Sequence, residues 1–140
     1  MNHRSLRAAL ITLELFVGVN ALYGGVGLLA GKLGVQREWL ANTPFQDFTV
    51  PAILLTVVVG GACFLAALMT AIGRVAGAEA SILAGCVTTG WIVIEMFLMP
   101  ASWLQPVIGL LGLTLVALGS LLLATFLPRR RNSLRDEISP

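Results

Sequence analysis

Four continuous apolar stretches take up most of this chain, and each has the length of about 20 residues that an α-helix needs to cross a hydrocarbon core. They cover approximately residues 8–31, 51–73, 79–99 and 105–127. Their apolar residues are continuous rather than alternating, which favours helices over the strands of a membrane barrel. The sequence therefore predicts an all-α fold, a bundle of four transmembrane helices.

The composition agrees with a membrane location, because 57% of the residues are apolar and only 11% are charged. The mean hydropathy of +0.90 lies well above that of soluble domains. Residues 1–140 are expected to form one integral membrane domain. Pro51 suits the first turn of the second span, the segment GRVAGAEAS (73–81) is expected to form a short polar turn, and Pro100 ends the third span.

Basic residues are distributed unevenly between the two sides of the predicted membrane. Seven of the nine Lys and Arg residues lie in the N-terminus, in the turn after the second span and in the tail 128–140. Lys32 and Arg37, in the loop 32–50, make up the rest. Because cytoplasmic segments retain the excess of Lys and Arg, both termini are expected in the cytoplasm, in a multi-pass protein of a bacterial plasma (inner) membrane.

The external loop 32–50 holds most of the polarity outside the termini, and residues 35–40 are expected to form one or two helical turns on the membrane surface. Trp39, Trp103 and the deeper Trp91 all fall in the outer half of the predicted bundle. Aromatic residues at this level anchor helices at the interface, which is the favoured role here, with ligand binding as the alternative. The candidate external residues are Asp47, Trp39, Trp103 and Gln105.

Common catalytic and cofactor motifs are missing from the sequence. Cys63 and Cys86 lie inside predicted spans, and the single histidine, His3, is terminal. The sequence has no Cys-x-x-Cys pair, phosphate-binding glycine loop or hydrolase nucleophile motif. We therefore expect no metal site, no cofactor, no catalytic residue and no nucleic-acid partner, and a protein that is not an enzyme.

Glu14, Asn20 and Glu95 are the strongly polar side chains inside the predicted spans. An ionised side chain costs roughly 3 kcal/mol or more at the centre of a membrane helix, so these groups should face other helices or a cavity. At about 1.5 Å per residue, Glu14 lies about 9 Å from the cytoplasmic edge and Glu95 about 6–8 Å from the outer edge. The two acids therefore lie at different depths, and a carboxylate pair is not expected.

The face that carries Glu95 allows two interpretations. Thr88, Trp91 and Glu95 follow one another at helical spacing on the third span. The favoured interpretation is a tight bundle in which the polar groups form structural hydrogen bonds, with glycines allowing close packing. The alternative is a cavity that opens outward, with Glu95, Asn20, Trp91 and Tyr23 in its walls and Asp47 and Gln105 at its mouth.

Four short motifs carry a resemblance to known proteins: PFQDFTVPAILL (44–55), VVVGG (57–61), GWIVIE (90–95) and SWLQP (102–106). Together they resemble a group of small bacterial four-span proteins that are labelled uncharacterised membrane proteins. The resemblance covers most of the chain, including all four spans. It implies a four-helix topology and supplies no activity, so no catalytic residue is carried over from it.

A second comparison rests on Glu14 in TLELFVGVNALYG (12–24). The small multidrug resistance transporters also have four short helices, with a membrane glutamate in the first. Their charge-balanced loops, which permit dual insertion, and the small-residue, Lys-terminated context after their glutamate are not matched here. The uneven distribution of basic residues predicts one fixed topology instead.

Two classes of function stay open from the sequence. The favoured one is a non-enzymatic accessory or assembly subunit, or a self-associating bundle, whose partners are the lipid bilayer and a second copy or another membrane protein. The other is a small proton- or cation-coupled transporter or solute-binding protein that uses Glu95, with Glu14 as the less favoured site.

Overall fold

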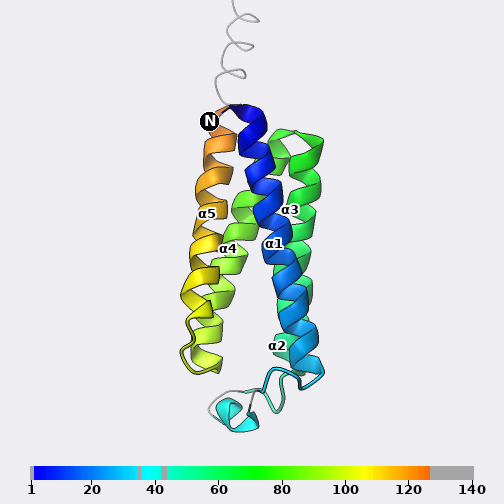
Figure 1. Cartoon of the computed structure of the whole chain (residues 1–140), viewed down its shortest axis with the longest axis vertical. Helices are drawn as coiled ribbons and strands as arrows, with labels where there is room; N and C mark the ends of the chain where they lie inside the picture. The colour runs from blue at the N-terminus through cyan, green and yellow to red at the C-terminus, as the bar shows by residue number, and fades with distance from the viewer. Residues whose placement is uncertain (1, 35, 42–43, 127–140) are drawn as a thin grey trace, which may run out of the picture.

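The computed structural model describes residues 2–34, 36–41 and 44–126, and the regular elements in this part are all helices. The described part contains four long helical segments, and they run along one axis (Figure 1). The elements are α1 (His3–Leu29), the 3-10 helix η1 (Arg37–Leu40), α2 (Thr49–Ile53), the π-helix η2 (Leu54–Gly60), α3 (Gly61–Ile72), α4 (Val75–Leu98) and α5 (Leu104–Ala124). We call the end of the bundle that carries η1 the loop end, and the opposite end the terminal end.

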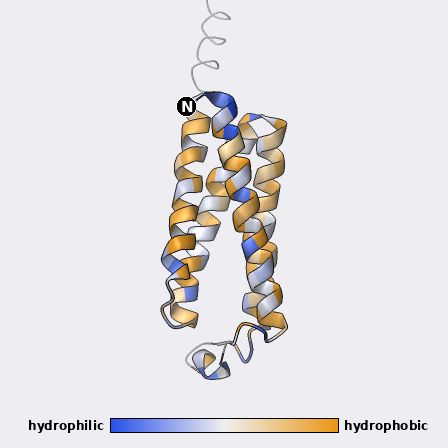
Figure 2. Ribbon diagram, viewed as in Figure 1, coloured by the Kyte–Doolittle hydropathy of each residue, from blue (hydrophilic) through white to orange (hydrophobic). Residues whose placement is uncertain are grey.

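Four segments are long and apolar enough to cross a membrane: α1, α2 through α3, α4 and α5. Between 22% and 39% of the residues in the most apolar part of each segment are buried inside the bundle. Hydrophobic residues predominate along all four segments (Figure 2), and many large apolar side chains are exposed on the outside of the bundle; Phe97, for example, is 81% exposed. The prediction of an all-α protein with four candidate spans is confirmed, and these features indicate a multi-pass membrane protein.

The ends of the four spans differ from the sequence-based bounds by one to five residues. α1 begins at His3, five residues before the predicted start, because Asn2 caps it: the Asn2 Oδ1 atom accepts a hydrogen bond of 2.7 Å from the Ser5 N–H. The second span begins at Thr49, two residues before Pro51, which lies in its first turn. The predicted cytoplasmic tail, 128–140, lies outside the described residues.

The predicted polar turn 73–81 is wrong, because α4 begins at Val75 and most of that segment is helical. The connection is reduced to Gly73, which ends α3 with a φ of 82°, and Arg74, which has an extended backbone. Gly77 makes so tight a connection possible, since a Cβ there would lie 2.7 Å from the Met69 carbonyl oxygen. The alanines and glycine of this stretch are compatible with a helix in a packed interior.

Small residues set the closest contacts between helices, and the pair α4 and α5 has the most extensive contact. A Cβ at Gly85 would lie 2.6 Å from the carbonyl oxygen of Gly112, and a Cβ at Gly112 would lie 3.1 Å from the carbonyl oxygen of Gly85. Any side chain at either position would therefore push the two backbones apart. The expectation that glycines allow close packing of the helices is met at this contact, where Gly112 packs against Gly85 inside the bundle.

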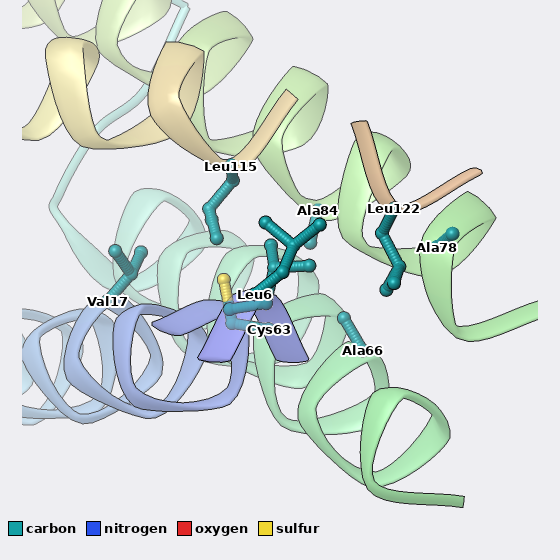
Figure 3. Packing of buried hydrophobic residues seen from close by; sticks show 9 residues of the cluster. Leu6, Val17, Cys63, Ala66, Ala78, Ala84, Leu115 and Leu122 are labelled. Carbon is teal, nitrogen blue, oxygen red and sulfur yellow. The ribbon is translucent and has the colours of Figure 1, made fainter. Parts of the chain in front are cut away.

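The main apolar core combines leucines of α1 and α5 with alanines of α3 and α4 (Figure 3). Its buried members are Leu6, Leu10, Val17, Cys63, Ala66, Ala78, Ala84, Leu115 and Leu122. The core thus combines long side chains with short ones from neighbouring helices, which allows the helices to pack closely. A separate cluster at the loop end holds Leu40 of η1 against α1 and α2.

Arg7 ties α1 to the end of α3 at the terminal end. Its guanidinium donates hydrogen bonds to the carbonyl oxygen of Thr70 from Nε at 3.1 Å and from Nη2 at 3.0 Å. A third bond of 2.7 Å runs from Nη2 to the carbonyl oxygen of Ala71. Carbonyls in the last turn of a helix have no intrahelical partner, and a cation there also suits the helix dipole.

Candidate functional site

A cavity of about 260 Å³ lies in the half of the bundle near the loop end. Its walls come from α1, η2, α4 and α5, where α1 and α5 diverge in the lower part of Figure 1. Most of the lining is apolar. The lining residues are Val17, Asn20, Ala21, Tyr23, Gly24, Leu28, Leu33, Leu55, Val59, Thr88, Trp91, Ile92, Glu95, Met99, Leu104, Gln105 and Ile108.

Glu95 supplies the carboxyl group of this cavity. It lies one turn after Trp91 on α4, and the Trp91 Nε1–H donates a hydrogen bond of 3.1 Å to Glu95 Oε2. Trp91 itself is 8% exposed and packs with Ala21, Val59 and Ile92. The indole therefore fixes one carboxyl oxygen against the wall.

Two amide side chains also line the cavity. Asn20 on α1 donates a hydrogen bond of 2.7 Å from Nδ2 to the carbonyl oxygen of Phe16, which orients its side chain along its own helix. Gln105 on α5 is only 2% exposed, and its Oε1 accepts a hydrogen bond of 3.1 Å from the Ser102 N–H. The Gln105 Nε2 group is buried without a hydrogen-bond partner. Such an unpaired donor is uncommon in a folded protein, and this one belongs to a residue of the cavity wall.

The π-helix η2 forms part of the wall through Leu55 and Val59. The sequence predicted an uninterrupted helix here. Its run of β-branched residues, Thr56 to Val59, followed by two glycines, is a poor former of α-helix. Single π-turns are frequent at functional sites, so the location of η2 beside the cavity supports a role for this region.

Of the candidate external residues, only Gln105 lines the cavity. Asp47 accepts a hydrogen bond of 2.9 Å from the Thr49 N–H at the start of α2, so it helps to begin that helix. Trp103 is 77% exposed, before α5, and Trp39 lies half-buried within η1, the helical turn expected in residues 35–40. Neither tryptophan is among the lining residues.

Glu14 lies elsewhere, in the half of the bundle near the terminal end. Its side chain is fully buried, and Oε1 is hydrogen-bonded to the Ser81 hydroxyl of α4. Ser81 precedes Glu95 on α4 by about four turns, or roughly 21 Å along the helix. The two acids are therefore in opposite halves of the bundle.

Sequence reasoning missed the partners of Glu14, which are Ser81 and, through it, Thr70. Ser81 had been assigned to the polar turn before the third span. The spacing of Gly77, Ser81 and Gly85, four residues apart each time, could have revealed it, because small residues at this spacing mark a helix face that packs closely on a neighbour.

Within the described residues, no group of three or more His, Cys, Asp or Glu side chains could hold a metal ion. Comparisons of the chain with protein-family models, with curated proteins and with solved structures find no match. The arrangement of the cavity is therefore the basis for a functional proposal.

Proposed function

We propose that the protein is a membrane protein that binds a small organic cation in the cavity between α1, η2, α4 and α5. The observation that carries this proposal is the carboxyl group of Glu95 in a wall that is otherwise mostly apolar. A volume of about 260 Å³ is slightly below that of pockets for drug-sized ligands. The solute is therefore expected to carry a single ring or a short chain.

The walls offer complementary contacts to such a solute. An ammonium group can donate a charge-assisted hydrogen bond to Glu95, which is stronger where few waters compete. The apolar part of the solute can lie against Leu55, Ile92 and Ile108, which also line the cavity. A bound cation also removes the cost of an ionised carboxylate at this depth.

The exposed side chains at the edge of the cavity indicate where a solute enters. The most exposed lining side chains include Tyr23 of α1, at 72%, and Leu104 of α5, at 48%. These helices diverge at the loop end, so we infer an opening between them near the membrane interface. An amphipathic cation concentrates at that interface, with its charged group in water and its apolar part among the lipid chains.

Three ligands with one carbon skeleton test the charge preference. Phenethylammonium is expected to bind more tightly than 2-phenylethanol, in which a hydroxyl replaces the ammonium group, and phenylacetate should bind weakest. Glu95→Gln should weaken phenethylammonium binding on the order of 10–100-fold, the loss of one charge-assisted hydrogen bond, and leave 2-phenylethanol unaffected. Isothermal titration calorimetry of the detergent-purified protein measures these affinities.

Glu79→Gln is the matched control, because Glu79 is an exposed acid on the same helix that does not line the cavity. It should leave all three affinities unchanged. If Glu95→Gln changes only the thermal stability of the protein, or lowers all three affinities equally, Glu95 has a structural role and the proposal fails.

The expectation of an accessory subunit or self-associating bundle stays a prediction. It depends on glycines of the spans being available for contacts with a partner. Gly18, Gly25, Gly112 and Gly119 instead lie close to neighbouring helices of the same chain. The cavity is therefore the better supported basis for a function.

We further infer that both termini are cytoplasmic, which puts the cavity in the outer half of the membrane. A membrane-impermeant maleimide added to intact cells should label Asn42→Cys and leave Ser133→Cys unlabelled. Permeabilised cells should give labelling at both positions. Labelling of both positions in intact cells contradicts the four-span topology.

A further inference from the structure

A second polar cluster is buried among the residues of the main apolar core, in the half of the bundle near the terminal end. Glu14 and Ser81 are fully buried, and Thr70 is 1% exposed. The Ser81 hydroxyl contacts Glu14 Oε1, lies 2.9 Å from the carbonyl oxygen of Gly77, and lies 3.1 Å from the Thr70 hydroxyl. The Thr70 hydroxyl lies 3.3 Å from the same Gly77 carbonyl oxygen. The cluster thus joins α1, α3 and α4.

The number of hydrogens available for hydrogen bonding in this cluster determines whether the Glu14 carboxyl group is protonated or ionised. A hydroxyl group has one hydrogen to donate, and a carbonyl oxygen has none. If Ser81 donates to the Gly77 carbonyl oxygen, the contact between Ser81 and Glu14 needs a hydrogen from Glu14. If Ser81 donates to an ionised Glu14 instead, its lone pairs face the Gly77 carbonyl oxygen at 2.9 Å. Only a protonated Glu14 gives each of the two contacts a hydrogen of its own.

The charges around the cluster agree with a neutral acid. Arg7, the nearest arginine along α1, is engaged with the carbonyl oxygens of Thr70 and Ala71. On α3 the ionisable neighbour is Cys63, which lies 3.7 Å from the Thr88 hydroxyl. On α4, Glu79 is exposed, and α5 has no ionisable side chain between Leu104 and Ala124. In the described residues, no cation pairs with Glu14.

The second carboxyl oxygen gives an independent observation. Glu14 Oε2 is buried without a hydrogen-bond partner. In a carboxylate this oxygen shares the negative charge, and burying it unpaired is strongly unfavourable. In a carboxylic acid that donates from Oε1, Oε2 is an uncharged carbonyl oxygen, which costs far less.

From this geometry we propose that Glu14 is a proton-binding site inside the membrane. The ligand is a proton taken up from water. This proton converts the Glu14 carboxylate to the carboxylic acid and is then held in the hydrogen bond from Glu14 to Ser81. The Ser81 hydroxyl donates a hydrogen bond to the Gly77 carbonyl oxygen. The Thr70 hydroxyl donates a hydrogen bond to the Ser81 hydroxyl or to the same carbonyl oxygen. This site is independent of the cavity and of the proposed cation binding.

Infrared difference spectroscopy of the full chain in detergent tests the proposal. A protonated carboxyl group gives a carbonyl stretching band that is separate from the amide bands and shifts in D₂O. The wild-type protein should show this band at neutral pH, and Glu14→Gln should remove it. Glu14→Gln should also stay folded, because an amide can donate to Ser81 as the acid does.

Two further variants assign the band. Glu95→Gln should leave it in place, and its loss in that variant would overturn the assignment to Glu14. Ser81→Ala retains Glu14 but removes its partner, so the band should shift in frequency. An unshifted band in Ser81→Ala would also contradict the proposal, and this variant keeps the test decisive if Glu14→Gln fails to fold.

A bound cation is the competing result. If the wild type shows carboxylate bands alone, and NaCl stabilises it against heat in a way that Glu14→Gln abolishes, the site holds a sodium ion and the proton proposal is wrong. Phenethylammonium binding should be the same in Glu14→Gln as in the wild type. Failure of either proposal therefore leaves the other intact.

Discussion

Gly85→Ala is expected to lower the free energy of unfolding by about 1–3 kcal/mol, the usual cost of overpacking a close contact. The added Cβ would lie 2.6 Å from the carbonyl oxygen of Gly112 and 2.8 Å from the backbone nitrogen of Val116. Backbone atoms cannot rotate away as a side chain can, so α4 and α5 must separate. SDS-induced or thermal unfolding of the purified protein measures the loss.

Gly90→Ala is the matched control on the same helix. Nothing lies within 4 Å of a Cβ built at Gly90, and alanine is the better helix former by about 0.5–1 kcal/mol. This variant should unfold at the same midpoint as the wild type or slightly later. Equal destabilisation by the two substitutions would contradict the close contact between α4 and α5.

Arg7→Gln is expected to lower the free energy of unfolding by roughly 1.5–3 kcal/mol, the range for hydrogen bonds to charged groups. The guanidinium makes three hydrogen bonds to the carbonyl oxygens of Thr70 and Ala71, and two of them are to the same oxygen. Glutamine is shorter and uncharged, so it cannot replace them. SDS-induced or thermal unfolding of the purified protein also measures this loss of stability.

Arg7→Lys separates charge from geometry. Lysine keeps the positive charge near the end of α3 but lacks the planar fork of arginine, so its stability should lie between those of the wild type and Arg7→Gln. If all three proteins unfold at one midpoint, the contact between α1 and α3 at this end contributes nothing to stability.

Hydropathy was enough to predict the helical class and the four spans, because lipid requires long apolar helices whatever their partners. It could not define the start of α4. Glu79 and Arg74 made residues 73–81 look like a loop, whereas the close packing of Gly77 on α3 keeps most of them helical. The π-helix η2 was also missed, since hydropathy does not distinguish between kinds of helix.

For the site, the depth along each helix and the helical spacing on the third span were both informative, since Thr88, Trp91 and Glu95 all line the cavity. Asn20 and Glu95 line the same cavity, in agreement with the alternative interpretation of the Glu95 face. The function of that cavity stays a prediction.

Asp47 could not be placed from the sequence, because its position depends on how the loop packs. The interaction of Glu14 with Ser81 was missed because residues 73–81 were expected to form a polar turn, although the predicted span 79–99 included Ser81.

The close approach of Gly85 and Gly112 has a consequence for how this sequence can change over evolution. Lipid-facing positions such as Phe97 need only remain apolar, so they can vary widely. A methyl group at position 85 would meet backbone atoms of α5 at 2.6 and 2.8 Å, and one at position 112 would meet the Thr89 hydroxyl at 2.6 Å and the Gly85 carbonyl oxygen at 3.1 Å. Relatives of this protein should therefore differ most on the outer surface of α4 and α5 and retain this pair of glycines, even where overall identity is low.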